Sequence, residues 1–220
     1  MAKLHPCGVY SVSNGCLGKY PFNSPPISAI LPSVAMAELT EPNPIWPDAN
    51  RLSPNHPFPA YRFVPGLNPH PTGDPKGHSY LKEEEDPHYI PPEKWKENDL
   101  YLYGIDLYHQ GYLWESHEAW ETIWHLTQKE DGEGQFLQGL IQNSAAQLKL
   151  HILEMEGASN LSQESLKHLR FVLNSGVCDT HQKFMGIHIP ELIKMMEDHY
   201  SPLWEEEGVI SAPPPHLLPS

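Results

Sequence analysis

The sequence has few of the residues that define several common classes of protein. It contains only three cysteines, at positions 7, 16 and 178, and no CxxC pair, which argues against a disulfide framework and a cysteine-type zinc site. Its 14 Lys and Arg face 28 Asp and Glu, and a net charge of −14 without a basic run argues against nucleic-acid binding. No apolar run approaches the ~18 residues of a transmembrane helix, so none is predicted.

A secretory signal is lacking as well. The apolar stretch ISAILPSVAMA is interrupted by Pro32, and no continuous apolar segment follows the basic Lys3. Reduced thiols and the absence of a signal together favour a cytoplasmic protein.

Proline is concentrated in the first half of the chain, with 18 of the 24 prolines before Trp95. Proline removes a backbone donor and disfavours helix at the residue before it, so this half is predicted to be irregular. Residues 1–59 are expected to be disordered or loosely ordered. Residues 60–95 also carry aromatic residues and two histidines, His70 and His78, and are expected to form an arm that packs on the folded domain.

The second half shows apolar residues at helical spacing. The pattern predicts five helices, at residues 98–110, 112–128, 135–156, 163–176 and 189–204. Ser162 is the expected N-cap of the fourth helix, after a turn at residues 157–160. Helices joined by short connections, without strand signals, predict an all-α fold. We therefore expect a single helical bundle over residues 96–204 and a flexible tail over residues 205–220.

The stretch ESHEAWETIW, residues 115–124, carries the most chemistry. On a helical wheel one apolar stripe contains Leu113, His117, Trp120 and Trp124. His117 is therefore expected to point into the core, with Glu121 one turn away on the flank of the stripe. Glu118 and His125 are expected nearer the solvent, and Glu115 on the outer face. A buried imidazole needs a partner, and Glu121 at i+4 is the nearest candidate.

The third predicted helix has a polar flank of its own. Gln138, Gln142 and Lys149 gather beside its apolar stripe, and small residues such as Ser144 would allow a neighbouring helix to approach. If the second and third helices pair antiparallel, these three side chains would line a ligand-binding pocket with Trp124 and the His117–Glu121 pair.

Two sequence motifs carry a family resemblance. HEAWETIW fits HxxxExxW, with His117, Glu121 and Trp124 in the fixed places, and FLQGLIQ, residues 136–142, follows after a short turn. The chain resembles the bacterial and archaeal family called domain of unknown function 309 over roughly residues 60–196, and its PGLNPHP…GHSY arm is similar to that of the longer members. The resemblance implies a small all-α protein with a metal site at the HxxxExxW motif, and it implies no particular activity.

The first functional hypothesis is a divalent-metal site. His117 and Glu121 at i and i+4 present mixed nitrogen and oxygen ligands, which zinc or another first-row metal accepts. Because a catalytic zinc takes three protein ligands, the third would come from Glu118, His125 or a histidine of the arm. Metal-assisted hydrolysis is the natural reaction, with Glu121 or Glu118 as the base.

Two other hypotheses stay open. The chain could be a non-catalytic module that binds a small molecule or a protein, with Lys149 as the partner of an anion and Trp124 lining the cleft. Alternatively, His117 and Glu121 could be a buried structural pair that fixes the helix register. Neither a membrane nor a nucleic acid is an expected partner.

Overall fold

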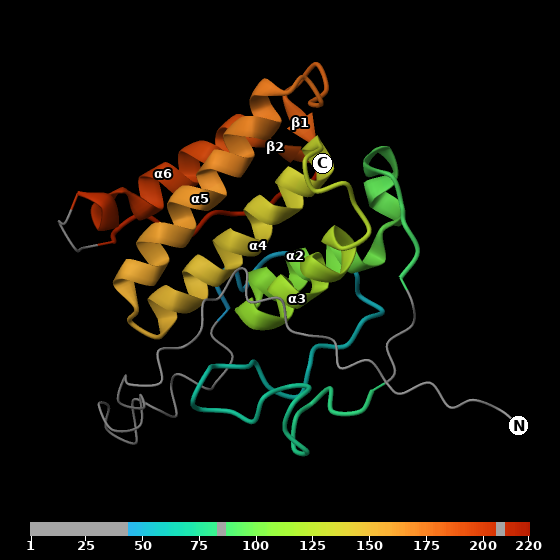
Figure 1. Ribbon diagram of the computed structural model, residues 1–220, viewed down its shortest axis with the longest axis vertical. Coiled ribbons are helices and arrows are strands. Elements are labelled where there is room, and N and C mark those ends of the chain that lie inside the picture. The colour runs from blue at the N-terminus through green and yellow to red at the C-terminus, as the bar shows by residue number, and fades with distance from the viewer. Residues whose placement is uncertain (1–43, 83–86, 206–209) are drawn as a thin grey trace, which may run out of the picture.

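The computed structural model describes residues 44–82, 87–205 and 210–220. Within them the chain forms a short 3-10 helix, five α-helices and one small hairpin. The helices are η2 (Pro92–Glu97), α2 (Asp99–His109), α3 (Leu113–Trp124), α4 (Gly132–His151), α5 (Met155–Asn174) and α6 (Ile189–Trp204). Each α-helix packs on the next, with α4 between α3 and α5 (Figure 1). The predicted all-α fold is confirmed, and no helix in the described ranges is long and apolar enough to cross a membrane.

The boundary between α4 and α5 differs from the prediction. The third predicted helix runs to residue 156, whereas α4 ends at His151 and α5 begins at Met155. The turn between them places Leu153 at a φ of 62°, and the amide of Glu154 donates to the carbonyl oxygen of Lys149 at 2.8 Å. Residues 157–160, which were expected to form the turn, lie inside α5. Packing of α5 on α4 overrides the low helix propensity of this Gly-Ala-Ser-Asn segment.

Ser162 is not an N-cap. It is fully buried within α5, where its hydroxyl donates to the carbonyl oxygen of Ser159 at 2.9 Å. The Ser162 hydroxyl oxygen accepts a hydrogen bond from the indole nitrogen of Trp204 at 3.1 Å. The residue therefore joins α5 to the end of α6.

Two glycines allow close helix contacts. Gly104 of α2 lies against the indole of the fully buried Trp120, and a β-carbon at this position would overlap the ring. The indole nitrogen of Trp120 donates to the carbonyl oxygen of Tyr101 at 3.2 Å. A β-carbon on Gly139 of α4 would lie 3.0 Å from Leu169 of α5. These contacts fix how α2, α3, α4 and α5 are rotated about their own axes.

A two-stranded antiparallel hairpin precedes α6, although the sequence shows no strand signal. Its strands are β1 (Lys183–Phe184) and β2 (Ile187–His188), each only two residues long. The turn places Met185 and Gly186 at φ angles of 46° and 81°. A strand this short offers no alternating pattern to detect, which explains why the prediction missed it.

The described arm starts before residue 60 and is attached to α2 by one carboxylate. Asp106 is 2% exposed and accepts hydrogen bonds from the side chain of Arg51 at 2.9 Å and from the amides of Leu52 and Ser53, each at 2.8 Å. The amide of Trp46 also donates to the carbonyl oxygen of His109 in α2 at 2.9 Å, so chain that the sequence assigns to a loosely ordered segment is held on α2 from residue 46. Residues 1–43, the rest of that segment, lie outside the described residues.

A second buried carboxylate attaches the arm to α3. The expectation that Glu115 lies on an outer face is wrong, because the arm covers that face and leaves Glu115 7% exposed. One oxygen of Glu115 accepts from the amide of Phe63 at 2.8 Å and from Nε2 of His78 at 2.9 Å. In Figure 1 the arm runs beneath α2 and α3, on the side away from α5 and α6.

The C-terminal segment is packed rather than loose over residues 210–220. Leu217 is fully buried, and its amide donates to Nε2 of His109 at 3.3 Å. Farther along, the amide of Ser220 donates to the carbonyl oxygen of Gly186 at 3.0 Å. The expectation of a flexible tail therefore fails for these residues, because the last residue of α2 and the hairpin turn before α6 hold them.

Candidate metal centre

Helix α3 positions the candidate ligands. Gly111, at a φ of 78°, ends the preceding segment, and α3 begins two residues later at Leu113. The predicted orientation of His117 is observed, since the residue is 4% exposed. Trp120 on the same stripe is fully buried, whereas Glu118 has a side chain that is 46% exposed.

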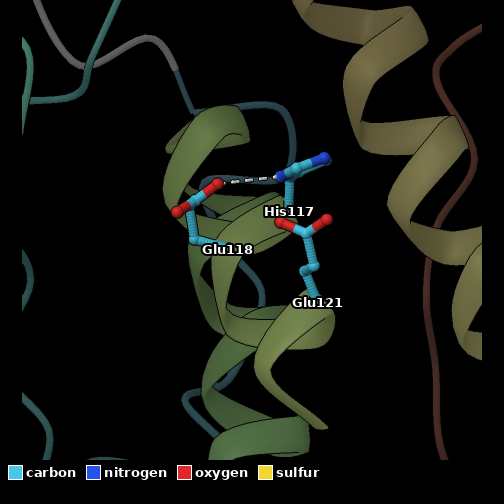
Figure 2. A group of neighbouring side chains, drawn as sticks. All are labelled: His117, Glu118 and Glu121. Atoms are coloured by element: carbon cyan, nitrogen blue, oxygen red, sulfur yellow. Dashed lines mark hydrogen bonds and ion pairs between the residues drawn. The ribbon is translucent and has the colours of Figure 1, made fainter. Parts of the chain in front are cut away.

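Three side chains of α3 come together. One potential ligand atom from each of His117, Glu118 and Glu121 lies within 4.8 Å of the other two. Nδ1 of His117 is 3.2 Å from a carboxylate oxygen of Glu118. Figure 2 shows the imidazole above the Glu121 carboxylate, with Glu118 reaching toward the ring from the other side. In the described part of the chain this is the one group of three or more histidine, cysteine or acidic residues with such spacing.

The sequence left several candidates for a third metal ligand, and the structure brings one of them, Glu118, next to His117 and Glu121. Glu118 belongs to the cluster, and His125 is exposed beyond the end of α3. In the arm, the Nδ1 atom of His70 accepts from the backbone amide of Gly73 at 3.2 Å, and His78 is hydrogen bonded to Glu115. Neither arm histidine is part of the cluster.

The arm nevertheless reaches the site through an aromatic residue that the sequence analysis did not single out for this role. The ring of Trp114 stacks on His117 with centroids 5.9 Å apart. The ring of Trp114 also makes edge contacts with His70 and Phe63, with ring centroids 5.5 Å and 5.0 Å apart. Its position three residues before His117 is the only sequence signal for this contact.

A hydroxyl pair between α3 and α4, also missed at the sequence level, sets the register of the two helices. Oγ of Ser116 lies 2.5 Å from Oγ of Ser144, which also donates to the carbonyl oxygen of Leu113 at 2.8 Å. In an antiparallel pair this register brings the half-buried Gln138 and Gln142 level with the turns that carry Glu121 and His117.

The remaining predicted ligand-binding residues are engaged elsewhere. Lys149 forms an ion pair with Glu154 and lies about 7 Å farther along α4 than Ser144. Trp124 is half-buried at the end of α3, and the ammonium of Lys129 lies 4.0 Å from its ring centroid. The role of Gln138 and Gln142 as ligand-binding residues stays a prediction.

The geometry of the cluster is close to that of a metal site. Two ligand atoms that each lie about 2.1 Å from one ion are at most about 4.2 Å apart. The observed limit of 4.8 Å exceeds this by a fraction of an ångström. A small rotation of the Glu118 or Glu121 side chain closes the difference, and both side chains are accessible enough to rotate.

The comparisons bear on the family alone. Neither the curated proteins nor the solved structures gave a match to this chain. Residues 101–161 match the model of the family described as Domain of unknown function (DUF309). The matched residues run from α2 through the first turns of α5 and contain the whole candidate metal centre. The match supports the family assignment made from the HxxxExxW motif.

Proposed function

We propose that this protein binds a divalent metal ion through His117, Glu118 and Glu121 of α3. The observation that carries the proposal is the convergence of one nitrogen and two carboxylate ligand atoms within 4.8 Å. A histidine with two carboxylates suits zinc and other first-row metals.

The proposed site would hold the ion in an open coordination. Three protein ligands leave at least one position for water, which is the arrangement of catalytic rather than structural zinc sites. Its ligands also differ in accessibility, because His117 is buried and Glu118 is not. The imidazole would anchor the ion on the core side, and the carboxylates would face outward.

Hydrolysis is the reaction that such a site would support best. A bound divalent cation supplies Lewis acidity. Glu118, the most exposed of the three ligands, would hold the ion through one carboxylate oxygen and accept a proton from water at the other. Glu121 would remain with His117 on the ion. The choice of Glu118 as base, over Glu121, rests on this difference in exposure.

The experiment is elemental analysis of protein purified without a histidine tag or chelator. Wild type is compared with His117→Ala and Glu121→Gln, and with His125→Ala, which removes an exposed histidine just beyond α3. We expect near-stoichiometric metal in wild type and His125→Ala, and loss of metal in the other two. Added metal at 100 times the Kd should raise the free energy of unfolding by about 2.7 kcal/mol in wild type and His125→Ala, and leave it unchanged in the other two variants.

The same measurement separates metal binding from a structural role. If wild type binds none of zinc, manganese, iron or nickel after incubation, the metal proposal is wrong. A fall in stability of His117→Ala would then assign the residue to a buried contact with Trp114 and Glu118. Where metal is bound, hydrolysis is tested with nitrophenyl esters and phosphates, and Glu118→Gln should lose turnover while retaining more metal than His117→Ala.

A further inference from the structure

A second candidate site lies beyond the C-terminal end of α3, where the connection to α4 meets the end of α5. It is a groove of about 1010 Å³. Its wall comes from four separate parts of the chain: residues 89–93 at the start of η2, the α3–α4 connection with the first turn of α4, the end of α5 with the residues just after it, and β1. Its volume is near the upper end of the 300–1,000 Å³ that is typical of small-molecule sites.

The groove is strongly acidic. Four carboxylates line it, from Glu93, Glu130, Asp131 and Glu133, and its described lining contains no lysine, arginine or histidine. The nearby ammonium of Lys129 lies over the ring of Trp124. A concave surface lined by one sign of charge concentrates ligands of the opposite sign.

Glu133 is the deepest of these acids and points to a ligand. It is 7% exposed, and its Oε2 accepts from the hydroxyl of Tyr89 at 2.8 Å. Its second oxygen, Oε1, is buried and has no hydrogen-bond partner. Burial together with the charges of Glu93 and Asp131 raises the pKa of Glu133. An unsatisfied buried acceptor is costly, and a cation that donates to it would remove that cost.

The groove also gathers exposed apolar side chains. Of the nine exposed large hydrophobic residues in the described ranges, four line it: Tyr89, Leu126, Phe171 and Val177, which are 51%, 37%, 46% and 43% exposed. Such a concentration is typical of a binding surface. A ligand that covers them must carry apolar atoms as well as positive charge.

These features favour an organic cation over a metal ion. The acids of the groove are not among the residues whose ligand atoms converge closely enough to hold an ion in the described structure. An ammonium group has three donors and suits a single carboxylate oxygen, while methylene groups suit the aromatic and aliphatic wall. We propose that the groove binds an aliphatic polyamine, with one primary ammonium on Glu133 and a second near the rim acids.

The test uses isothermal titration calorimetry with spermidine at low ionic strength. Glu133→Gln keeps an acceptor for Tyr89 and removes the charge, and Phe171→Ala removes exposed apolar surface. As controls, Glu156→Gln makes the same charge change, and Met155→Ala likewise removes exposed apolar surface, at the first turn of α5, more than 20 Å along the helix from Phe171. We expect Glu133→Gln to weaken binding roughly tenfold or more and Phe171→Ala about threefold or more. The controls should stay within about twofold.

Three outcomes would overturn the proposal. Equal weakening by Glu133→Gln and Glu156→Gln would show attraction to the net charge alone. Binding of Mg²⁺ as tight as that of spermidine would show that the apolar stem contributes nothing. Binding of the tripeptide acetyl-Lys-Leu-Lys-amide tenfold tighter than spermidine would show that the groove takes a basic segment of a partner protein instead. Phe171→Ala alters an exposed residue, so its result stands even if Glu133→Gln fails to fold.

Discussion

The carboxylate of Asp106 holds the first part of the arm, and the substitution Asp106→Asn tests this. Oδ2 accepts from Arg51 and Ser53, and Oδ1 accepts from Leu52. An asparagine keeps the shape but has one acceptor oxygen, so its amide nitrogen must face at least one of the three donors. The variant therefore loses at least one charge-assisted hydrogen bond and leaves the Arg51 charge without its counter-ion.

The magnitude follows from these contacts. A hydrogen bond to a charged group contributes about 1.5–3 kcal/mol, and a buried donor without a partner costs about 1–3 kcal/mol more. The Arg51 side chain is 29% exposed, so solvent screening places the energy of its hydrogen bond to Asp106 at the lower end of this range. We expect a total of about 2–4 kcal/mol against the attached state of the arm, which is roughly a 30-fold to 1,000-fold larger population of detached arm.

Hydrogen exchange measures this population directly. The amides of Leu52 and Ser53 donate to Asp106, so their exchange in Asp106→Asn should accelerate by that factor, while amides in the centre of α4 change far less. Asp198→Asn is the control, because Asp198 is an exposed partner of Lys194 on α6. Unchanged exchange at Leu52 and Ser53, or equal acceleration throughout α4, would refute the role of Asp106 as a local attachment point.

Two further predictions concern packing and pH. Gly104→Ala should lower the free energy of unfolding by about 1–3 kcal/mol in urea titrations, because the added carbon overlaps Trp120. Gly157→Ala is the control and should not destabilise the protein, because its added carbon meets only a flexible lysine side chain. Burial lowers the pKa of His109 from 6.5 to about 4. Below pH 6.5 the unfolded chain therefore takes up a proton at this residue before the folded protein does, so the contribution of neutral His109 to the free energy of unfolding is fully present above pH 6.5 and is lost as the pH falls toward 4. In unfolding titrations from pH 7 to 4, this residue should account for a decrease of about 3 kcal/mol in the free energy of unfolding. That part of the decrease should be absent in His109→Gln and unchanged when the exposed His181 is substituted.

Local patterns predicted the helical half well. The first and fourth predicted helices end at residues 110 and 176, close to the observed ends of α2 and α5, and Gly111 and Gly176 just beyond those ends both adopt a φ of 78°. The burial of His117 followed from the apolar stripe of α3 alone. Each of these features depends on residues within a few positions of one another, where helical periodicity and glycine conformation are decisive.

The remaining features depend on contacts between distant segments. Asp106 and Glu115 are ordinary charged positions on their own helices, and they become buried because the arm supplies backbone donors to both. The packed C-terminal segment depends in the same way on His109, which is 108 residues from its partner Leu217. Helical periodicity says which face of a helix is polar, but not which loop covers that face.

The difference between local patterns and contacts of distant segments explains why only one of the two candidate sites could be predicted from the sequence. The proposed metal ligands occupy positions i, i+1 and i+4 of one helix, so a linear motif can describe them. Their orientation is nevertheless set by packing, since Trp120 against Gly104 and Ser116 against Ser144 hold α3 in the rotation that buries His117 and exposes Glu118. The fold therefore brings the three side chains together, and a side-chain rotation would complete the proposed site. The acidic groove has its carboxylates on separate segments, and only the folded chain brings Glu93 near Glu133.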